Sequence, residues 1–304
     1  MNNPVAFPIK KESRWQWMQQ WSDLAHSLSR SRLAIIGLAL FVIIVFLSIT
    51  APLIAPHDPM DQDLVNKLLP PAWEAQGSPA HLLGTDHFGR DTLSRLLYGA
   101  NISLRASGFA ALFALLLGVT IGILAGYVGG LLEALLMRIV DVFLAFPLIL
   151  IALALAAILG PSLQNLIIVM GITGWMTYAR VVRATVLTLK SQEFIESAVA
   201  SGCSRWRIMW KHILPNIVAP SLVLFTFGFA QFIILESGLS FLGLGVPPPA
   251  PTWGRMLYEG RDYLTVNAWN ITLPGLCIMT VVLSVNFFGD GLRDALDPRL
   301  RRLA

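Results

Sequence analysis

Long apolar runs restrict the fold of this chain more than any other feature. The first extends from Leu33 to Ala55, and about 23 helical residues reach roughly 34 Å, which is enough to cross a hydrocarbon core of about 30 Å. Further runs lie at about 104–128, 139–160, 163–187, 216–236 and 267–288. Only 13% of the residues are charged, whereas soluble domains carry about 25%. The sequence therefore predicts an all-α integral membrane protein with six transmembrane helices.

Lysine and arginine residues indicate the orientation of these helices. If the N-terminus is cytoplasmic, 16 of the 22 basic residues lie inside, in residues 1–32, at Arg138, from Arg180 to Lys211 and in residues 291–304. Because basic residues concentrate on the cytoplasmic side, we expect both termini to be cytoplasmic. The net charge of +4 follows from this bias and does not predict nucleic-acid binding.

The remaining segments complete the predicted organisation. Residues 1–32 mix basic residues with tryptophans and leucines, which is typical of an amphipathic helix lying at the membrane interface. Residues 33–55 then form an uncleaved membrane anchor, since this run is longer than the apolar part of a signal peptide. Residues 56–103 are polar and form an outer, extracytoplasmic segment.

A polar stretch from Ser191 to Pro215 interrupts the apolar sequence. Ser191 is a candidate cap for a first short helix, and Gly202 permits that helix to end. Ser204 can cap a second, basic helix, which Pro215 closes. The stretch lies on the predicted cytoplasmic side, so a helix–glycine–helix element suited to docking is expected there.

This stretch resembles the E-A-A…G…L-P motif of binding-protein-dependent ABC import permeases. The matching residues are Glu196, Ser197, Ala198, Gly202, Leu214 and Pro215. Ser197 departs from the usual Ala, and His212 stands where Ile is common. In that family the segment is a coupling helix that contacts a cytoplasmic ATPase. The alternative interpretation is an ordinary amphipathic helix at the membrane surface.

Three other blocks resemble one branch of this family, the C-type subunit of dipeptide, oligopeptide and nickel importers. They are Gly84–Gly99, with Gly-Thr-Asp and Gly-Arg-Asp motifs; Leu239–Gly254, with Leu-Ser-Phe-Leu-Gly-Leu-Gly; and Asn286–Pro298. The first block could also be a surface helix with weak ion pairs among Asp86, Arg90, Asp91 and Arg95.

The resemblance implies a type I ABC importer permease in the inner membrane of a bacterial cell. Residues 104–290 would form a five-helix core with a coupling loop at 188–215, followed by a cytoplasmic tail at 291–304. The chain would form half of the path for a small peptide or similar solute. Its expected partners are two cytoplasmic ATPase subunits, a second, related permease and an extracytoplasmic solute-binding protein. ATP and Mg would bind to the ATPase subunits, and no cofactor is expected on this chain.

Two features within the spans predict helix packing. Gly118, Gly122 and Gly126 recur every four residues, which places them on one helix face and allows close approach of a second helix. In the third span, we expect Arg138 to pair with Asp141 one turn away at the membrane boundary, and Pro147 to kink the helix.

The candidate residues for the substrate path or an outer gate lie around the end of the fifth span. The segment Leu239–Gly245 is too short to cross a bilayer and too apolar for an ordinary loop, so its backbone must be buried or line a cavity. The candidates are Gln231, Glu236, Leu239, Phe241 and Gly243. Helix–helix hydrogen bonding and packing are the alternative roles.

Two other function classes fit the sequence less well. An ion-coupled secondary transporter predicts carboxylates or histidines at mid-membrane, but all five histidines lie outside the predicted spans. An intramembrane enzyme requires a catalytic constellation, and no such motif is evident in the spans. The two cysteines, Cys203 and Cys277, have no metal-binding spacing, so neither a metal site nor a disulfide framework is predicted.

Overall fold

The computed structural model describes Leu28 and residues 31–296, and every regular element in these residues is a helix. The predicted interfacial helix in residues 1–32 and the end of the C-terminal tail therefore lie almost entirely outside the described residues. The principal helices are α2 (Arg32–Ile49), α4 (Thr92–Val128), α5 (Gly130–Leu144), α6 (Leu148–Leu159), α7 (Leu163–Lys190), α10 (Leu214–Phe241) and α12 (Trp269–Leu296). The shorter elements are α3 (Ala51–Ile54), η1 (Leu64–Asn66), α8 (Glu193–Ala200), α9 (Arg205–Ile208), η2 (Met209–Ile213), α11 (Trp253–Gly260) and η3 (Arg261–Tyr263).

The prediction of an all-α protein with six spans is confirmed, with the third span in two pieces. Five of the described helices are long and apolar enough to cross a membrane. The third span in chain order brings the total to six and consists of α5 and α6, which are bent by 89° at their junction. Pro147 lies directly before α6 and has no N–H to continue the hydrogen bonds of α5. The predicted kink at Pro147 is therefore confirmed, and it breaks the helix rather than bending it gently.

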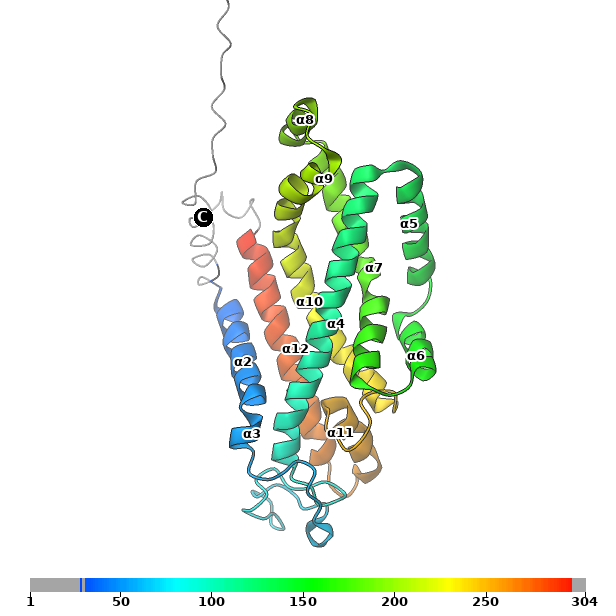
Figure 1. The fold of residues 1–304 in the computed structure, drawn as a ribbon. Helices are drawn as coiled ribbons and strands as arrows, with labels where there is room; N and C mark the ends of the chain where they lie inside the picture. Colours follow the sequence, from blue (N-terminus) through cyan, green and yellow to red (C-terminus); the bar gives the residue numbers. More distant parts are fainter. Residues whose placement is uncertain (1–27, 29–30, 297–304) are drawn as a thin grey trace, which may run out of the picture.

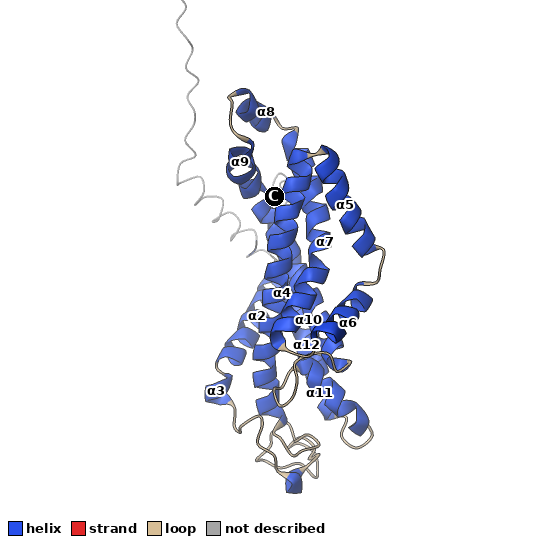
Figure 2. Ribbon diagram, turned by 45° about the vertical axis from the view of Figure 1, so that its right-hand side comes forward, coloured by secondary structure: helices blue, strands red, loops and turns tan. Residues whose placement is uncertain are grey.

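The spans run roughly parallel, with α4 in the middle of the bundle (Figure 1). Helix α4 packs against both α7 and α10, and α2 packs on α12. The short helix α8 projects at one end, whereas α11 and the 55–91 loops gather at the other (Figure 2). The molecule thus has a coupling-loop end and a loop-rich end, separated by the spans.

Small residues bring α4 and α7 into close contact. A Cβ atom built on Gly118 would lie 2.5 Å from the Cβ of Tyr178, and one on Gly122 would lie 2.7 Å from the Cβ of Val182. On Gly126 the corresponding distance to the Cβ of Val186 is 2.8 Å. These distances are too short for real Cβ atoms, so the three glycines are what permits this separation of the two helix backbones.

Several helix ends differ from the expected ones. Helix α4 begins at Thr92 rather than near residue 104, because the Asp91 side chain caps it by accepting a hydrogen bond from the Ser94 N–H. Helix α10 continues to Phe241 instead of ending near residue 236. The first three residues of the predicted gate segment, Leu239–Phe241, therefore belong to the last turn of this helix.

Candidate coupling segment and outer polar network

The coupling segment consists of α8, a turn at Gly202, and α9. Gly202 has a positive φ of 75°, which suits the residue that ends a helix. Its N–H donates to the Val199 carbonyl at 3.0 Å, and the Cys203 N–H donates to the Ala198 carbonyl at 3.1 Å. These two bonds form a Schellman C-cap. Ser204 then caps α9, because its side chain accepts a hydrogen bond from the Arg207 N–H, as predicted.

The start of α8 differs from the sequence prediction. Gln192 is the N-cap of this helix and makes no side-chain capping bond. Ser191 instead ends α7, and its hydroxyl donates to the carbonyl of Thr188. Ser191 is therefore not a helix N-cap, because α7 extends further toward the coupling segment than expected.

Helix α8 has one face against the protein and one face free. Ile195 and Ala198 are buried, whereas Glu196, Ser197 and Gly202 are exposed. The side chain of Ala198 packs inward and so does not contribute to the free face of α8. The free surface that remains for a partner carries Glu196, Ser197 and the Gly202 turn.

A buried cluster connects the coupling segment to the spans. Its members are Ile123 and Tyr127 from α4, Val182 and Val186 from α7, Ile195 and Ala198 from α8, and Ile208, Met209, Ile213 and Ile217 around α10. Six elements contribute to this cluster, namely α4, α7, α8, α9, η2 and α10, so a displacement of α8 would meet resistance from both flanking spans. The coupling segment is consequently built as part of the bundle and not as a detached loop.

Leu214 and Pro215 do not end a helix. Arg205–Phe241 forms one continuous helical span, and a single π-helical turn at Met209–Ile213 precedes Leu214. Such a turn accommodates the missing N–H of Pro215. The prediction that Pro215 closes the basic helix is thus wrong. Leu214 is half-buried against the cluster, and Pro215 is exposed.

Two ion pairs join α5 to α7 at the end near the coupling segment. Asp141 Oδ1 lies 2.5 Å from Arg180 Nη2, and Glu133 Oε1 accepts from Arg183 Nε at 2.6 Å. The expected pair between Arg138 and Asp141 is not among the ion pairs of the described residues. Asp141 pairs with Arg180 of the neighbouring helix α7 instead of with Arg138 in the preceding turn of α5.

The candidate path residues fall into two groups. Glu236 and Leu239 have no exposed surface, whereas Gln231, Phe241 and Gly243 are exposed. Glu236 accepts a hydrogen bond from the Ser240 hydroxyl at 2.8 Å. The hydroxyls of Ser103 and Thr252 also bond to it. Glu236 therefore connects α10 to α4 and to the start of α11. This is the alternative role of helix–helix hydrogen bonding, and not a role in lining the substrate path.

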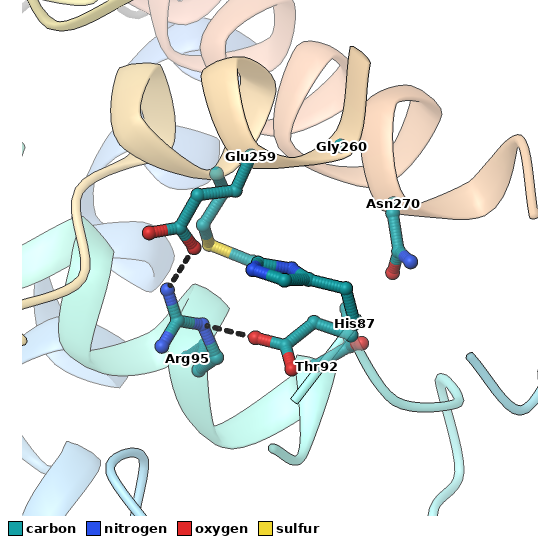
Figure 3. A pocket seen from close by; sticks show the side chains of 8 residues that line it. His87, Thr92, Arg95, Glu259, Gly260 and Asn270 are labelled. Atoms are coloured by element: carbon teal, nitrogen blue, oxygen red, sulfur yellow. Dashed lines mark hydrogen bonds and ion pairs between the residues drawn. The ribbon is translucent and has the colours of Figure 1, made fainter. Parts of the chain in front are cut away.

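A second polar network lies at the loop-rich end (Figure 3). Asp86 contacts Arg90 at 2.6 Å and Arg95 at 3.3 Å. Glu259 of α11 receives the same two arginines at 2.8 and 2.9 Å. The two arginine side chains are only 4% and 1% exposed. The interpretation of these residues as an exposed helix with weak ion pairs is therefore wrong.

Sequence reasoning missed Glu259 because it lies more than 160 positions from its partners. The stretch from Asp86 to Arg95 has two aspartates and two arginines, so its local charge is balanced and gave no signal of a distant acidic partner. The network surrounds a small cavity of about 10 Å³ that His87 and Asn270 also line. Burial lowers the pKa of His87, and Arg90 and Arg95 act in the same direction, against Asp86 and Glu259.

The comparisons with known proteins agree with this architecture. Residues 118–302 match the family described as "Binding-protein-dependent transport system inner membrane component". Residues 19–71 match the "N-terminal TM domain of oligopeptide transport permease C".

Two curated relatives cover nearly the whole chain. The "Dipeptide transport system permease protein DppC" of Escherichia coli (strain K12) is 45% identical over 94% of this chain and 95% of its own length. The protein of the same name from Haemophilus influenzae is 41% identical over 99% of both chains.

Among solved structures, the inward-facing MetNI methionine ABC transporter matches with a TM-score of 0.56 at 21% identity. The match covers 67% of this chain and 97% of the other, which supports the fold. The chain belongs to the family of inner-membrane components of binding-protein-dependent transport systems.

Proposed function

We propose that the chain is one of two permease subunits in an ATP-driven importer and that it forms half of the path for a small peptide. The relatives named dipeptide permeases support the substrate class. The single observation that carries the coupling role is the placement of α8. It projects at one end of the bundle (Figure 1) while sharing a buried cluster with α4, α7 and α10.

The proposed partners follow from the two ends of the molecule. Two cytoplasmic ATPase subunits, which bind ATP and Mg, dock on the free face of α8. A solute-binding protein delivers the peptide at the loop-rich end, and a related permease completes the path. In this arrangement both termini are cytoplasmic, in agreement with the basic residues in the coupling segment.

The proposed mechanism is alternating access. Closure of the ATPase pair moves α8, and the buried cluster passes this movement to α7 and α10. The two ion pairs between α5 and α7 make the broken span move with α7. Of the five candidate path residues, Gln231, Phe241 and Gly243 remain candidates for lining the path, because only these three are exposed on the surface of the subunit.

Co-purification of an ATPase tests this proposal. The full-length chain would be extracted from its native membrane in mild detergent, beside Gly202→Asp and the control Gly160→Asp. Gly202 and Gly160 both have positive φ, 75° and 79°. A Cβ at either position meets nothing within 4 Å. The two substitutions therefore impose similar backbone strain and similar charge, but only Gly202 lies on the coupling segment.

We expect a P-loop ATPase to accompany the wild-type chain and Gly160→Asp, and to be reduced with Gly202→Asp. Peptide uptake should fall in parallel, while the amount of Gly202→Asp inserted in the membrane stays normal. Normal uptake by Gly202→Asp would refute the coupling role of this turn. If no ATPase accompanies the wild-type chain, the proposed docking of an ATPase on α8 is wrong.

A further inference from the structure

Two histidines and an aspartate converge at the loop-rich end, outside the buried arginine network. His81 Nδ1 lies 2.9 Å and His57 Nδ1 lies 3.6 Å from the same oxygen, Asp91 Oδ1. The three ligand atoms all lie within 4.8 Å of one another, and the two imidazole rings are 4.6 Å apart. We propose that these three side chains form a binding site for a divalent transition metal of the Zn²⁺ class.

The carboxylate of Asp91 is held in place for this role. Its Oδ2 accepts hydrogen bonds from both the N–H and the hydroxyl of Ser94, each at 2.8 Å. The Ser94 hydroxyl also accepts from the His57 N–H at 3.1 Å, which fixes the backbone of one ligand relative to the other. Oδ1 is thereby left to face the two imidazoles.

The charge of Asp91 lacks a permanent counterion among the described residues. Its side chain is fully buried, and its only ion-pair partners in this part of the chain are the two histidines, which carry charge only when protonated. A buried carboxylate is costly unless it is paired or bound to a metal. A divalent cation between Oδ1 and the two Nδ1 atoms would supply the missing charge at neutral pH.

The donor set and its geometry fit zinc better than magnesium or calcium. Two imidazole nitrogens and one carboxylate oxygen are ligands that Zn²⁺ prefers, whereas magnesium and calcium prefer oxygen alone. Tetrahedral zinc with bonds of about 2.0–2.2 Å places its ligand atoms roughly 3.3 Å apart. The two distances to Asp91 Oδ1, 2.9 and 3.6 Å, lie on either side of this value. His57 is 39% exposed, so water can reach a fourth position.

The neighbouring group of Asp86, His87 and Glu259 also has ligand-like spacing, but it does not suit a cation. Both of its carboxylates are already paired with Arg90 and Arg95. Arginines therefore neutralise the carboxylates of the Asp86 cluster but not that of Asp91. His87 is for this reason a suitable control for the loss of a histidine near the proposed metal site.

The proposed site would clamp the outer segment to the bundle. His57 follows α3, His81 lies in the loop before Gly84, and Asp91 caps α4. Local sequence spacing gave no indication of a site, because the ligands are separated by 24 and 10 positions of chain.

Equilibrium dialysis of the full-length chain in detergent against Zn²⁺ tests the proposal. We expect the wild-type chain to bind one Zn²⁺ and to melt at a higher temperature with Zn²⁺ than with EDTA. His57→Gln should weaken binding by at least about tenfold, and His57→Gln with His81→Gln should abolish it. His87→Gln and His212→Gln should bind as the wild-type chain does.

His57→Gln serves as the variant that preserves the fold, because His57 is the most exposed of the three ligands. The proposal is wrong if the wild-type chain binds no more Zn²⁺ than the double variant. It is equally wrong if His57→Gln retains full affinity while His87→Gln loses it.

Discussion

At the scale of single residues, the buried charge network is the most demanding feature of the molecule. Asp86 and Glu259 each contact both Arg90 and Arg95, so two negative and two positive groups are taken out of water together. Such an arrangement is stable only while its charges balance. The network joins the start of α4 and the segment before it to α11, which is far away in sequence, and thereby fixes the loop-rich end of the bundle.

Replacement of Arg95 by methionine should destabilise the protein strongly. Methionine fills a similar space but leaves Asp86 with Arg90 alone, and Glu259 with Arg90 and with Arg255, which lies 2.9 Å away on the same helix. Breaking a buried pair costs about 3 kcal/mol or more. The exposed pair of Arg261 and Asp262, with side chains 47% and 71% exposed, provides the control. Arg261→Met should change the stability by less than about 1 kcal/mol. Thermal unfolding in detergent would measure both, and equal effects would contradict the structural role of the network.

His87 should make the stability depend on pH. Burial lowers its pKa in the folded protein, while an unfolded histidine has a pKa of about 6.5. The unfolded state therefore binds more protons than the folded state below that pH, and stability is lost as the pH falls from about 6.5 towards the lowered pKa. The melting temperature of the wild-type chain should drop between pH 7.5 and pH 5.5 more than that of His87→Gln. Parallel pH profiles for the two proteins would contradict this assignment.

At the scale of elements, the contact between α4 and α7 depends on its glycines. A Cβ on Gly122 would lie 2.7 Å from the Val182 Cβ and 2.8 Å from the Ala179 carbonyl oxygen, whereas on Gly108 of the same helix the nearest atom is 3.5 Å away. Gly122→Ala should therefore cost about 1–3 kcal/mol through overpacking, and Gly108→Ala should be tolerated. The melting temperatures of the two variants in detergent would show the difference. Equal tolerance would mean that the helices can separate freely.

The sequence predicted most of these elements because hydropathy and glycine spacing are local signals. It failed where distant residues decide the outcome. Asp141 pairs with Arg180 of the next span rather than with Arg138. Glu236 is buried because the Ser240 hydroxyl donates a hydrogen bond to it. Arg95 is buried because Asp86 and Glu259 form ion pairs with it. Likewise, the Schellman turn at Gly202 followed from the local sequence, but the inward direction of Ala198 depends on the cluster beneath it.

At the scale of the whole molecule, the two ends have different chemistry. The end with α8 carries exposed basic and aromatic side chains, including Arg205, Trp206 and Arg207, beside a buried hydrophobic cluster. The opposite end holds the buried ion network and the proposed metal site. Helix α4 connects the two ends (Figure 1), as the proposed transmission of movement along the subunit requires.

This polarity makes a prediction about membrane orientation. Basic residues near the coupling segment should hold that end in the cytoplasm. Ser201→Cys and Ala75→Cys place single exposed thiols at the two ends, once Cys203 and Cys277 are replaced by alanine. A membrane-impermeant maleimide added to intact cells should label residue 75 but not residue 201, and both should react after permeabilisation. Labelling of residue 201 in intact cells would show that the molecule has the opposite orientation, in which α8 could not contact a cytoplasmic ATPase.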